Sequence, residues 1–245
     1  KVNPKTIGDN GENVLHNLVK KNDQQEIAAY FLAKGVDVNQ TNKEGNTVLM
    51  EAAKGTNVEM LKTVLGKTKN INQRNNNGMS ALTFAVNNGS ADVVSTLMTE
   101  KADIQVRDNS GNIITYYLIQ SYRPLRPNQK DEFSDKITVL EKSGVDFKEL
   151  QKDGNSILHL AVSKNDLKLL QKLEKYEIDI NAVNEEIMTP LHKAALIAKD
   201  DKILKYLVEK GADVTIKTEF DETAYDLASE NEVLQKNAIN IDFLK

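Results

Sequence analysis

Three histidines, His16, His159 and His192, are the side chains of this sequence best suited to catalysis or metal binding. An imidazole titrates near neutral pH, so each could serve as a general base or as a metal ligand. Each histidine directly follows a leucine in a similar local pattern, and no acidic or nucleophilic residue stands at a fixed spacing from both His159 and His192. The pattern therefore favours a structural role for the histidines. A stand-alone enzyme with its site at His159 and His192 is the least favoured of three hypotheses, and the other two, which are binding functions, are given at the end of this subsection.

Composition and motifs restrict other chemistry. The sequence has no cysteine, which excludes disulfides, thiolate nucleophiles and cysteine-based zinc or iron–sulfur sites. It has no glycine-rich phosphate loop, zinc-protease helix motif or nucleophile elbow. Aspartates recur about once per unit, which favours turn formation over calcium binding, since a calcium loop needs several oxygen ligands within about a dozen residues. These aspartates are Asp37, Asp103, Asp146, Asp179 and Asp213. We therefore expect no enzymatic activity, no cofactor and no bound metal.

Glycines mark a period of 33 or 34 residues along the chain, apart from one longer interval of 43. The series consists of Gly11, Gly45, Gly78, Gly111 and Gly154, and Ile187 and Asp221 continue it. A period of this length, held over the whole chain, is typical of stacked repeats. No unit of this size could bury its apolar face alone, so neighbouring units must stabilise one another.

Each period contains the signals of two helices. In the clearest unit, Thr189 suits a helix N-cap because its hydroxyl can accept a hydrogen bond from a free backbone N–H. Pro190 suits the first helical turn, where no N–H is needed. A second apolar set, such as Ile203-Leu204 with Leu207-Val208, has the spacing of a second amphipathic helix. An alternating segment and a turn rich in Asn, Asp and Gly then lead to the next unit.

The stretch Met188-Thr189-Pro190-Leu191-His192-Lys193-Ala194-Ala195 resembles the Thr-Pro-Leu-His-x-Ala signature of ankyrin repeats, whose period is about 33 residues. The resemblance covers nearly the whole chain. It implies an all-α repeat solenoid in which each repeat is a helix, a loop, a second helix and a β-hairpin finger. It also implies that the motif histidine hydrogen-bonds the backbone between neighbouring repeats.

We predict a single ankyrin-repeat domain over residues 1–245, with six repeats and a degenerate C-terminal capping repeat. The repeats are expected near residues 8–40, 41–73, 74–106, 107–149, 150–182 and 183–216, and the capping repeat at 217–245.

Two features depart from the repeat pattern. Ile187 and Asp221 replace the finger glycine, so those two turns need a different conformation or carry a small strain. In the fourth repeat, residues 113–117 replace the motif, and an insertion occupies about residues 123–132. The insertion contains Pro124 and Pro127, which predict a stiff, non-helical loop.

We predict that a partner binds the concave face and the fingers, centred on repeats two to four. The four arginines fall in predicted loops rather than helices, and arginine is enriched at protein interfaces. Exposed loop cations without a partner are an equally acceptable interpretation of these four. The resemblance adds the positions that flank the finger glycine and two late positions of the first helix. The predicted binding residues are Arg74, Arg107, Met79, Asn87, Asn88, Asn112, Tyr116, Gln120, Arg123, Arg126, Leu196 and Ile197.

These features favour a non-catalytic scaffold that binds another protein of unknown identity. The net charge of −4 argues against general nucleic-acid binding, and no apolar run is long enough to span a membrane. We expect a monomer, in the cytoplasm, the periplasm or outside the cell. The alternative is the recognition arm of a larger protein, such as a bacterial effector or an enzyme whose catalytic domain lies elsewhere. It is motivated by the start at Lys1 and by Val2-Asn3, which resembles the end of a preceding finger.

Overall fold

The computed structural model describes residues 3, 5–21 and 23–245, and these form two compact units that divide between Val145 and Asp146. Short helices and tight turns account for the regular structure of both units. Within the described residues, the β-structure consists of a single antiparallel bridge between Thr41 and Thr47. None of the helices in these residues has the length and apolar character needed to cross a bilayer.

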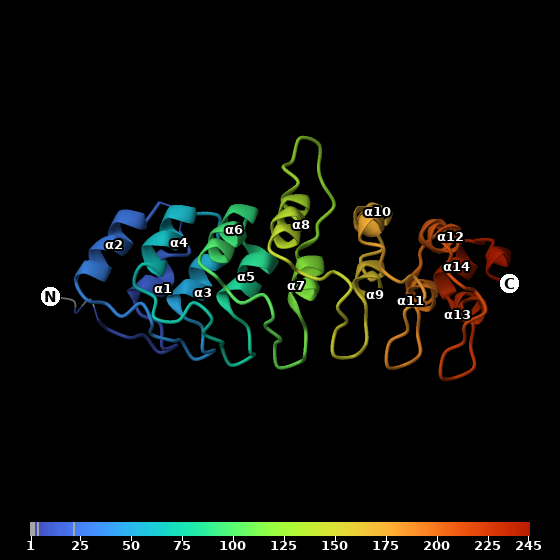
Figure 1. The fold of residues 1–245 in the computed structure, drawn as a ribbon, viewed down its shortest axis with the longest axis horizontal. Coiled ribbons are helices and arrows are strands. Elements are labelled where there is room, and N and C mark those ends of the chain that lie inside the picture. The colour runs from blue at the N-terminus through green and yellow to red at the C-terminus, as the bar shows by residue number, and fades with distance from the viewer. Residues whose placement is uncertain (1–2, 4, 22) are drawn as a thin grey trace. The chain divides into compact units, whose positions relative to one another are not determined.

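The first unit contains four successive helix pairs within its described residues. The helices are α1 (Val14–Leu18), α2 (Gln25–Ala33), α3 (Val48–Ala53), α4 (Val58–Leu65), α5 (Ala81–Asn88), α6 (Ala91–Thr99), α7 (Ile114–Ser121) and α8 (Glu132–Lys142). The first helices of the pairs pack side by side in one row, and the second helices pack in another (Figure 1). Leucines at repeated positions, including Leu49, Leu82 and Leu118, are completely or almost completely buried between the rows.

The second unit repeats this arrangement with α9 (Ile157–Val162), α10 (Leu167–Leu173), α11 (Pro190–Ile197), α12 (Lys202–Glu209), α13 (Ala224–Glu230) and α14 (Glu232–Lys236). Two 3₁₀ helices, η1 (Glu174–Tyr176) and η2 (Asp242–Leu244), follow α10 and α14. Helix α11 packs between α9 and α13, while α10 packs against α12. The core again consists of aliphatic side chains such as Leu169, Leu191 and Leu204.

Side-chain caps begin the first helices where the repeated threonine or serine is present. The Thr47 hydroxyl accepts from the Met50 N–H at 3.3 Å, and the Thr189 hydroxyl accepts from the His192 N–H at the same distance. These bonds satisfy backbone donors that a helix leaves unpaired in its first turn. Helix α7 is different, because its N-cap residue is Ile113, which has no side-chain acceptor.

Each finger is a tight turn with one repeated hydrogen-bond pattern. In the finger that begins at Asn75, the Asn75 N–H donates to the Met79 carbonyl, and the Gly78 N–H donates to the Asn75 carbonyl, both at 2.9 Å. The glycine has a φ of +79°, so the finger is a four-residue turn that ends in a left-handed residue. A side chain on Gly78 would collide with its neighbour, since a Cβ atom there would lie 2.6 Å from Asn109 Oδ1.

Backbone hydrogen bonds also join neighbouring fingers inside each unit. The Asn76 N–H donates to the Glu44 carbonyl at 3.0 Å, and the Asn109 N–H donates to the Asn77 carbonyl at 2.9 Å. In the second unit, the Glu185 N–H donates to the Asp153 carbonyl at 3.0 Å. The prediction of β-hairpin fingers needs one correction. The turns are present, but the chain on either side of each turn is too short to form a strand ladder.

The two residues that replace the finger glycine keep the left-handed conformation. Ile187 has a φ of +54° and Asp221 a φ of +63°. Both turns therefore carry the strain foreseen as one alternative, and neither adopts a different conformation. Ile187 is 46% exposed, so its side chain meets solvent rather than a packed neighbour.

The insertion is a non-helical loop between the end of α7 and the start of α8, and it extends beyond the ends of these helices in Figure 1. The Tyr122 ring, at the base of the loop, packs edge-on against Phe133 with 5.0 Å between ring centroids. Residues 123–130 are all exposed. The proline-rich loop is thus held at its base by aromatic packing and is otherwise open to solvent.

Candidate protein-binding groove

A polar groove of about 570 Å³ lies on the first unit, between two fingers and two first helices. The fingers contribute Asn77, Met79, Asp108, Asn109, Ser110 and Asn112, helix α5 contributes Asn87 and Asn88, and helix α7 and its C-terminal end contribute Tyr116, Tyr117, Gln120 and Arg123. Most of these side chains are amides or hydroxyls, which can both donate and accept hydrogen bonds. The groove therefore presents a dense set of uncharged polar groups.

The repeat period explains why these residues meet. Asn87 lies 33 residues before Gln120, and Met79 lies 33 before Asn112, so each pair occupies the same position in neighbouring repeats. Helix α5 packs directly against α7, which places the late residues of both helices side by side. The fingers at residues 75–79 and 108–112 are joined by the backbone bond from Asn109 to Asn77. The groove is thus formed by equivalent surfaces of two stacked repeats.

Asp108 and Tyr117 organise the inner wall of the groove. The Tyr117 hydroxyl donates to Asp108 Oδ2 at 2.6 Å, and Asn112 Nδ2 donates to the same oxygen at 2.9 Å. The other carboxylate oxygen accepts from the N–H groups of Ser110 and Asn112. These hydrogen bonds outweigh desolvation and lower the pKa of Asp108, while burial and the nearby carboxylate raise the pKa of Tyr117. Asp108 is therefore a structural carboxylate whose oxygens are already satisfied.

Tyr116 occupies the position that histidine takes in the typical repeats. Its ring is half-buried and meets the Tyr117 ring edge-on, with 5.4 Å between centroids. Tyr116 lines the groove, whereas the motif histidines are buried inside the stack. The fourth repeat thus presents an aromatic side chain to a ligand at a position that is normally structural.

The groove contains seven of the twelve predicted binding residues. These are Met79, Asn87, Asn88, Asn112, Tyr116, Gln120 and Arg123. Leu196 and Ile197 belong to the second unit, on α11, and are 48% and 39% exposed. All twelve residues stay predictions as partner contacts, and the groove brings seven of them together.

The finger arginines outside the groove are engaged with the backbone. Arg74 Nε donates to the Gly78 carbonyl at 2.9 Å, and its Nη2 contacts the Arg107 carbonyl. Arg107 Nη1 donates to the Gly111 carbonyl at 3.4 Å. Both side chains therefore stabilise their own fingers, a role that the spacing of residues in the sequence does not indicate. Arg74 also links its finger to the next one.

Arg123 lies where the groove meets a second concavity. This concavity, of about 720 Å³, is lined by Arg123, Pro124, Arg126, Pro127, Asn128 and Gln129 of the insertion. Arg123 Nη1 donates to the carbonyls of Gln120 and Tyr122, both at 2.7 Å. One guanidinium thus belongs to both concavities.

Sequence reasoning missed five groove residues: Asn77, Asp108, Asn109, Ser110 and Tyr117. The Tyr117 residue is only 4% exposed, so it also packs in the core. One usable signal was present, because Asn77 and Ser110 are register equivalents next to the finger glycine. The Tyr117–Asp108 pair had no signal, since nothing in the spacing shows that the hydroxyl reaches back to its own finger.

The motif histidines tie the first helix of their repeat to backbone further along the chain, which lies in the next repeat for His16 and His159. His159 Nδ1 accepts from the Ser156 N–H at 3.1 Å, and its Nε2 donates to the Met188 carbonyl at 2.8 Å. His192 Nε2 donates to the Ile216 carbonyl at 2.9 Å, and His16 Nε2 to the Asn46 carbonyl at 3.2 Å. A carbonyl oxygen can only accept, so Nε2 carries the proton in each ring. Burial lowers the pKa of all three histidines, and lowers that of His159 to about 4.

The recurring aspartates form turns. Asp37, Asp103, Asp146, Asp179 and Asp213 each accept the N–H of the residue two positions further on. This geometry is the one expected of an aspartate that stabilises its own turn. Across the residues that the structure describes, no cluster of three or more His, Cys, Asp or Glu side chains could hold a metal ion.

A buried lysine lies close to the groove. Lys136 of α8 is 5% exposed, and its Nζ donates to the Val86 carbonyl of α5 at 2.9 Å. Desolvation lowers the pKa of Lys136 to about 8, and the positive charge of Arg123 acts in the same direction, against the opposing effect of Glu132. Glu132 in turn accepts from the Ala91 N–H at the start of α6, at 2.9 Å.

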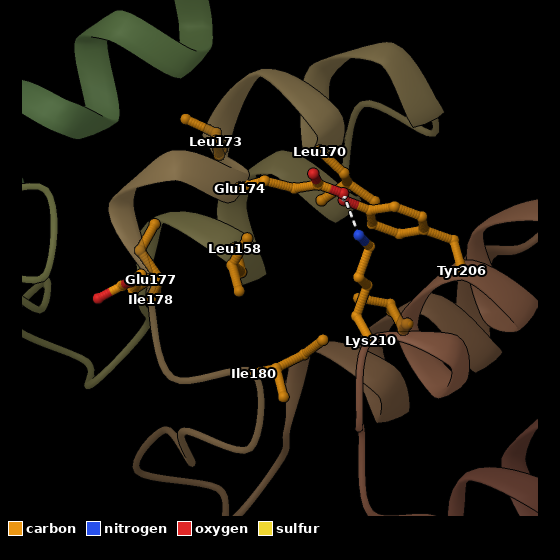
Figure 2. Close-up of a pocket in the computed structure, with 10 residues that line it drawn as sticks. Leu158, Leu170, Leu173, Glu174, Glu177, Ile178, Ile180, Tyr206 and Lys210 are labelled. Atoms are coloured by element: carbon orange, nitrogen blue, oxygen red, sulfur yellow. Dashed lines mark hydrogen bonds and ion pairs between the residues drawn. The ribbon is translucent and has the colours of Figure 1, made fainter.

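The second unit has an apolar cavity of about 320 Å³ between α10, η1 and α12 (Figure 2). Its wall includes Leu170, Leu173 and Ile180. At the rim, Glu174 accepts from Lys210 Nζ and from the Tyr206 hydroxyl, both at 2.7 Å. The rim groups are thus paired with one another, and the cavity contains none of the predicted binding residues.

A family model of ankyrin repeats in three copies matches residues 15–108 and 129–218. The chain belongs to the ankyrin-repeat family. Its fold is therefore the all-helical ankyrin solenoid, and ankyrin repeats generally act as non-catalytic protein-binding modules. The unmatched segment between the two ranges holds Tyr116, Gln120 and Arg123, so part of the groove lies where the chain departs most from the family pattern.

Solved structures show the same fold. The human ASB11 ankyrin-repeat domain matches 91% of this chain and 96% of its own with a TM-score of 0.76 and 20% identity. A chain in the complex of the Bd0816 predatory endopeptidase from Bdellovibrio bacteriovorus with immunity protein Bd3460 matches 84% of this chain and 98% of its own, with a TM-score of 0.65 and 23% identity.

Relatives by sequence include large spider toxins. Alpha-latrocrustotoxin-Lt1a of Latrodectus tredecimguttatus is 32% identical over 102 residues, and alpha-latroinsectotoxin-Lt1a of the same species is 35% identical over 102 residues. Each match covers 40% of this chain but only 7% of the toxin. The matches therefore relate this chain to a small part of each toxin.

Proposed function

We propose that this protein is a non-catalytic interaction module that binds a partner protein in the polar groove of the first unit. The observation that carries the proposal is the convergence of amides, a tyrosine ring and an arginine in one concavity between α5, α7 and their fingers. Tyrosine and arginine are enriched in the energetically dominant contacts of protein interfaces. A stacked-repeat surface is also extended enough to contact a protein.

The groove favours binding over catalysis because Asp108 and Tyr117, two of its ionisable side chains, are hydrogen-bonded to each other and to their surroundings. Asp108 accepts four hydrogen bonds, and burial beside Asp108 raises the pKa of Tyr117. Neither group is placed to exchange protons near neutral pH. Asn, Gln and Ser side chains can recognise a partner without undergoing chemistry.

Two matched variants test the proposal. Asn88→Glu with Gln120→Glu adds two negative charges inside the groove, whereas Ser95→Glu with Thr138→Glu adds the same charge at exposed positions of α6 and α8. In affinity capture from the source organism followed by mass spectrometry, we expect a protein that wild type and the Ser95/Thr138 variant retain and the groove variant loses. Circular dichroism checks that both variants are folded. Retention of the same partners by all three proteins would contradict the groove as the binding site.

A second candidate function is the recognition arm of a larger protein. The spider-toxin matches favour it, because there a segment of this kind occupies only a small part of a much longer chain. The complete reading frame of the source gene is the direct test. A frame that encodes nothing beyond a signal peptide and these repeats would rule this candidate out. The single-domain arrangement, the count of six repeats with a cap, and the monomeric state belong to the first proposal, the stand-alone interaction module.

A further inference from the structure

The end of the groove at Arg123 carries positive charge that no acidic side chain offsets. The Arg123 guanidinium donates hydrogen bonds to the carbonyls of Gln120 and Tyr122, which are neutral. Arg126 is exposed and lines the adjoining concavity of the insertion. In the part of the chain that the structure describes, neither guanidinium pairs with a carboxylate. Two arginines therefore stand available at one end of the groove.

The third cation of the insertion behaves differently. Lys130 Nζ lies 2.8 Å from Glu132 Oε1 and 3.3 Å from Asp135 Oδ2. These contacts raise the pKa of Lys130 and neutralise its charge locally. The contrast within one loop indicates that the acidic residues around α8 compensate the lysine and leave the arginines to an external anion. A guanidinium binds a carboxylate through two parallel hydrogen bonds, which makes it the better ligand for such a group.

The rest of the groove is suited to a peptide main chain. Asn77, Asn87 and Asn88 each carry one acceptor and two donors on a planar amide, and Gln120 and Asn109 add further amides, with Asn109 Nδ2 donating to the Asn76 carbonyl. This combination matches the alternating N–H and C=O groups of an extended backbone. The one carboxylate of the lining, Asp108, has both oxygens occupied by internal hydrogen bonds, so it offers no acceptor to a ligand. Apolar lining is limited to Met79 and the two tyrosine rings.

We propose that the groove binds an extended acidic peptide segment of the partner, with its carboxylates on Arg123 and Arg126 and the adjoining main chain along the amides. This inference rests on the proposed function and specifies the part of the partner that is recognised. A nucleic acid would place phosphates along the whole groove, where the structure offers amides and a carboxylate rather than cations. Positive charge at one end only fits a peptide with a localised acidic cluster.

A peptide-display experiment on the full chain tests the inference. A library of random linear peptides is selected on immobilised wild type, and enriched peptides are measured by fluorescence polarisation. We expect enrichment of Asp and Glu at adjoining positions. Arg123→Gln with Arg126→Gln is expected to weaken binding by about tenfold or more, because charge-assisted hydrogen bonds are lost. Added salt is expected to weaken wild-type binding, since both guanidinium groups are near solvent.

Lys130→Gln is the matched control, because it removes a cation from the same loop that is already paired. Binding by this variant is expected to stay within about twofold of wild type, as exposed compensated ion pairs contribute little. Selected peptides without acidic residues, or equal affinity in the Arg123/Arg126 variant, would overturn the inference. So would a failure to select any peptide when a folded partner is captured through the groove, although the proposed function would then stand. A captured partner that ignores the groove variant would remove the proposed function itself.

Discussion

The fourth and sixth repeats solve the same structural problem with different side chains. In the sixth repeat, Thr189 caps α11, and the buried His192 connects the Thr189 N–H to the Ile216 carbonyl. In the fourth, Ile113 stands at the N-cap without a side-chain acceptor, and Tyr116 replaces the histidine. Helix α7 is tied instead to the finger that precedes it, because the Tyr117 hydroxyl donates to Asp108.

The difference shows that a position used for hydrogen bonds inside the stack in one repeat can serve as a ligand-facing surface position in another. Where the histidine is present, its polar atoms are used inside the stack and its side chain is buried. In the fourth repeat, where Tyr116 replaces it, the same position lines the groove, and the neighbouring Tyr117 bonds α7 to its own finger. The late helix positions also differ, with Gln120 and Ser121 in the fourth repeat and the exposed pair Leu196 and Ile197 in the sixth.

The largest expected effect is the loss of stability when the motif histidine of a typical repeat is removed. His192→Ala removes a buried ring that pairs a backbone N–H and a carbonyl, so both groups lose their partner. We expect a loss of about 3 kcal/mol in the free energy of unfolding. Tyr116→Ala, at the equivalent half-exposed position, is expected to cost about 1 kcal/mol. Urea denaturation followed by circular dichroism measures both. Equal losses would show that the fourth repeat has not transferred this role.

The typical repeats are also expected to weaken in acid. The folded-state pKa of His159 is about 4, against about 6.5 for an unperturbed histidine, so the unfolded chain binds the proton first as the pH falls. Stability is therefore full above about pH 6.5 and decreases toward pH 4, by at most about 3 kcal/mol from this residue. The difference in unfolding free energy between wild type and His159→Gln, measured across this range, isolates the effect. A constant difference would contradict it.

The fourth repeat is expected to respond at alkaline pH instead. Lys136 has a folded-state pKa of about 8, below its ordinary value of 10.5. Between these values the unfolded chain binds more protons, so stability rises with pH, by at most about 3 kcal/mol. Lys136→Met should remove this rise, and Lys130→Met, at an exposed position, should retain it. Thermal unfolding between pH 7 and 10.5 provides the comparison, and a rise that persists in Lys136→Met would assign it to another group.

The smallest expected effect is a gain in the sixth repeat. Ile187 holds a left-handed conformation that β-branched residues disfavour. Ile187→Gly should relieve this strain and stabilise the protein by about 1 kcal/mol, offset in part by the greater freedom of glycine in the unfolded chain. Gly78→Ala, in the third repeat, should have the opposite sign. A melting temperature that falls in Ile187→Gly would show that the exposed isoleucine makes a stabilising contact.

Local sequence signals predicted the fold well and the groove only in part. The period and the caps located the helices because each depends on residues close together in the chain, as for Thr189 with His192. Met79, Asn87, Asn88, Asn112 and Gln120 followed from the repeat positions that the resemblance supplied, whereas Arg123 followed from its residue type and its place in the insertion. The Tyr117–Asp108 bond and the bracing of the fingers by Arg74 depend on side-chain conformation, which spacing does not specify. The sequence showed that the turn at Ile187 would be either strained or different in conformation. It did not show which of the two, and the structure has the strained left-handed turn.

The backbone bonds between neighbouring fingers have a consequence for how such a surface can change. Asn76 bonds to Glu44, and Asn109 to Asn77, through main-chain atoms that every residue except proline possesses. These main-chain bonds hold neighbouring finger tips together whatever side chains the tips carry, and side-chain bonds such as the one from Arg74 to the Arg107 carbonyl add to them. Substitutions of finger-tip side chains that take no part in these bonds can therefore change which partner is bound while the main-chain bonds between fingers remain.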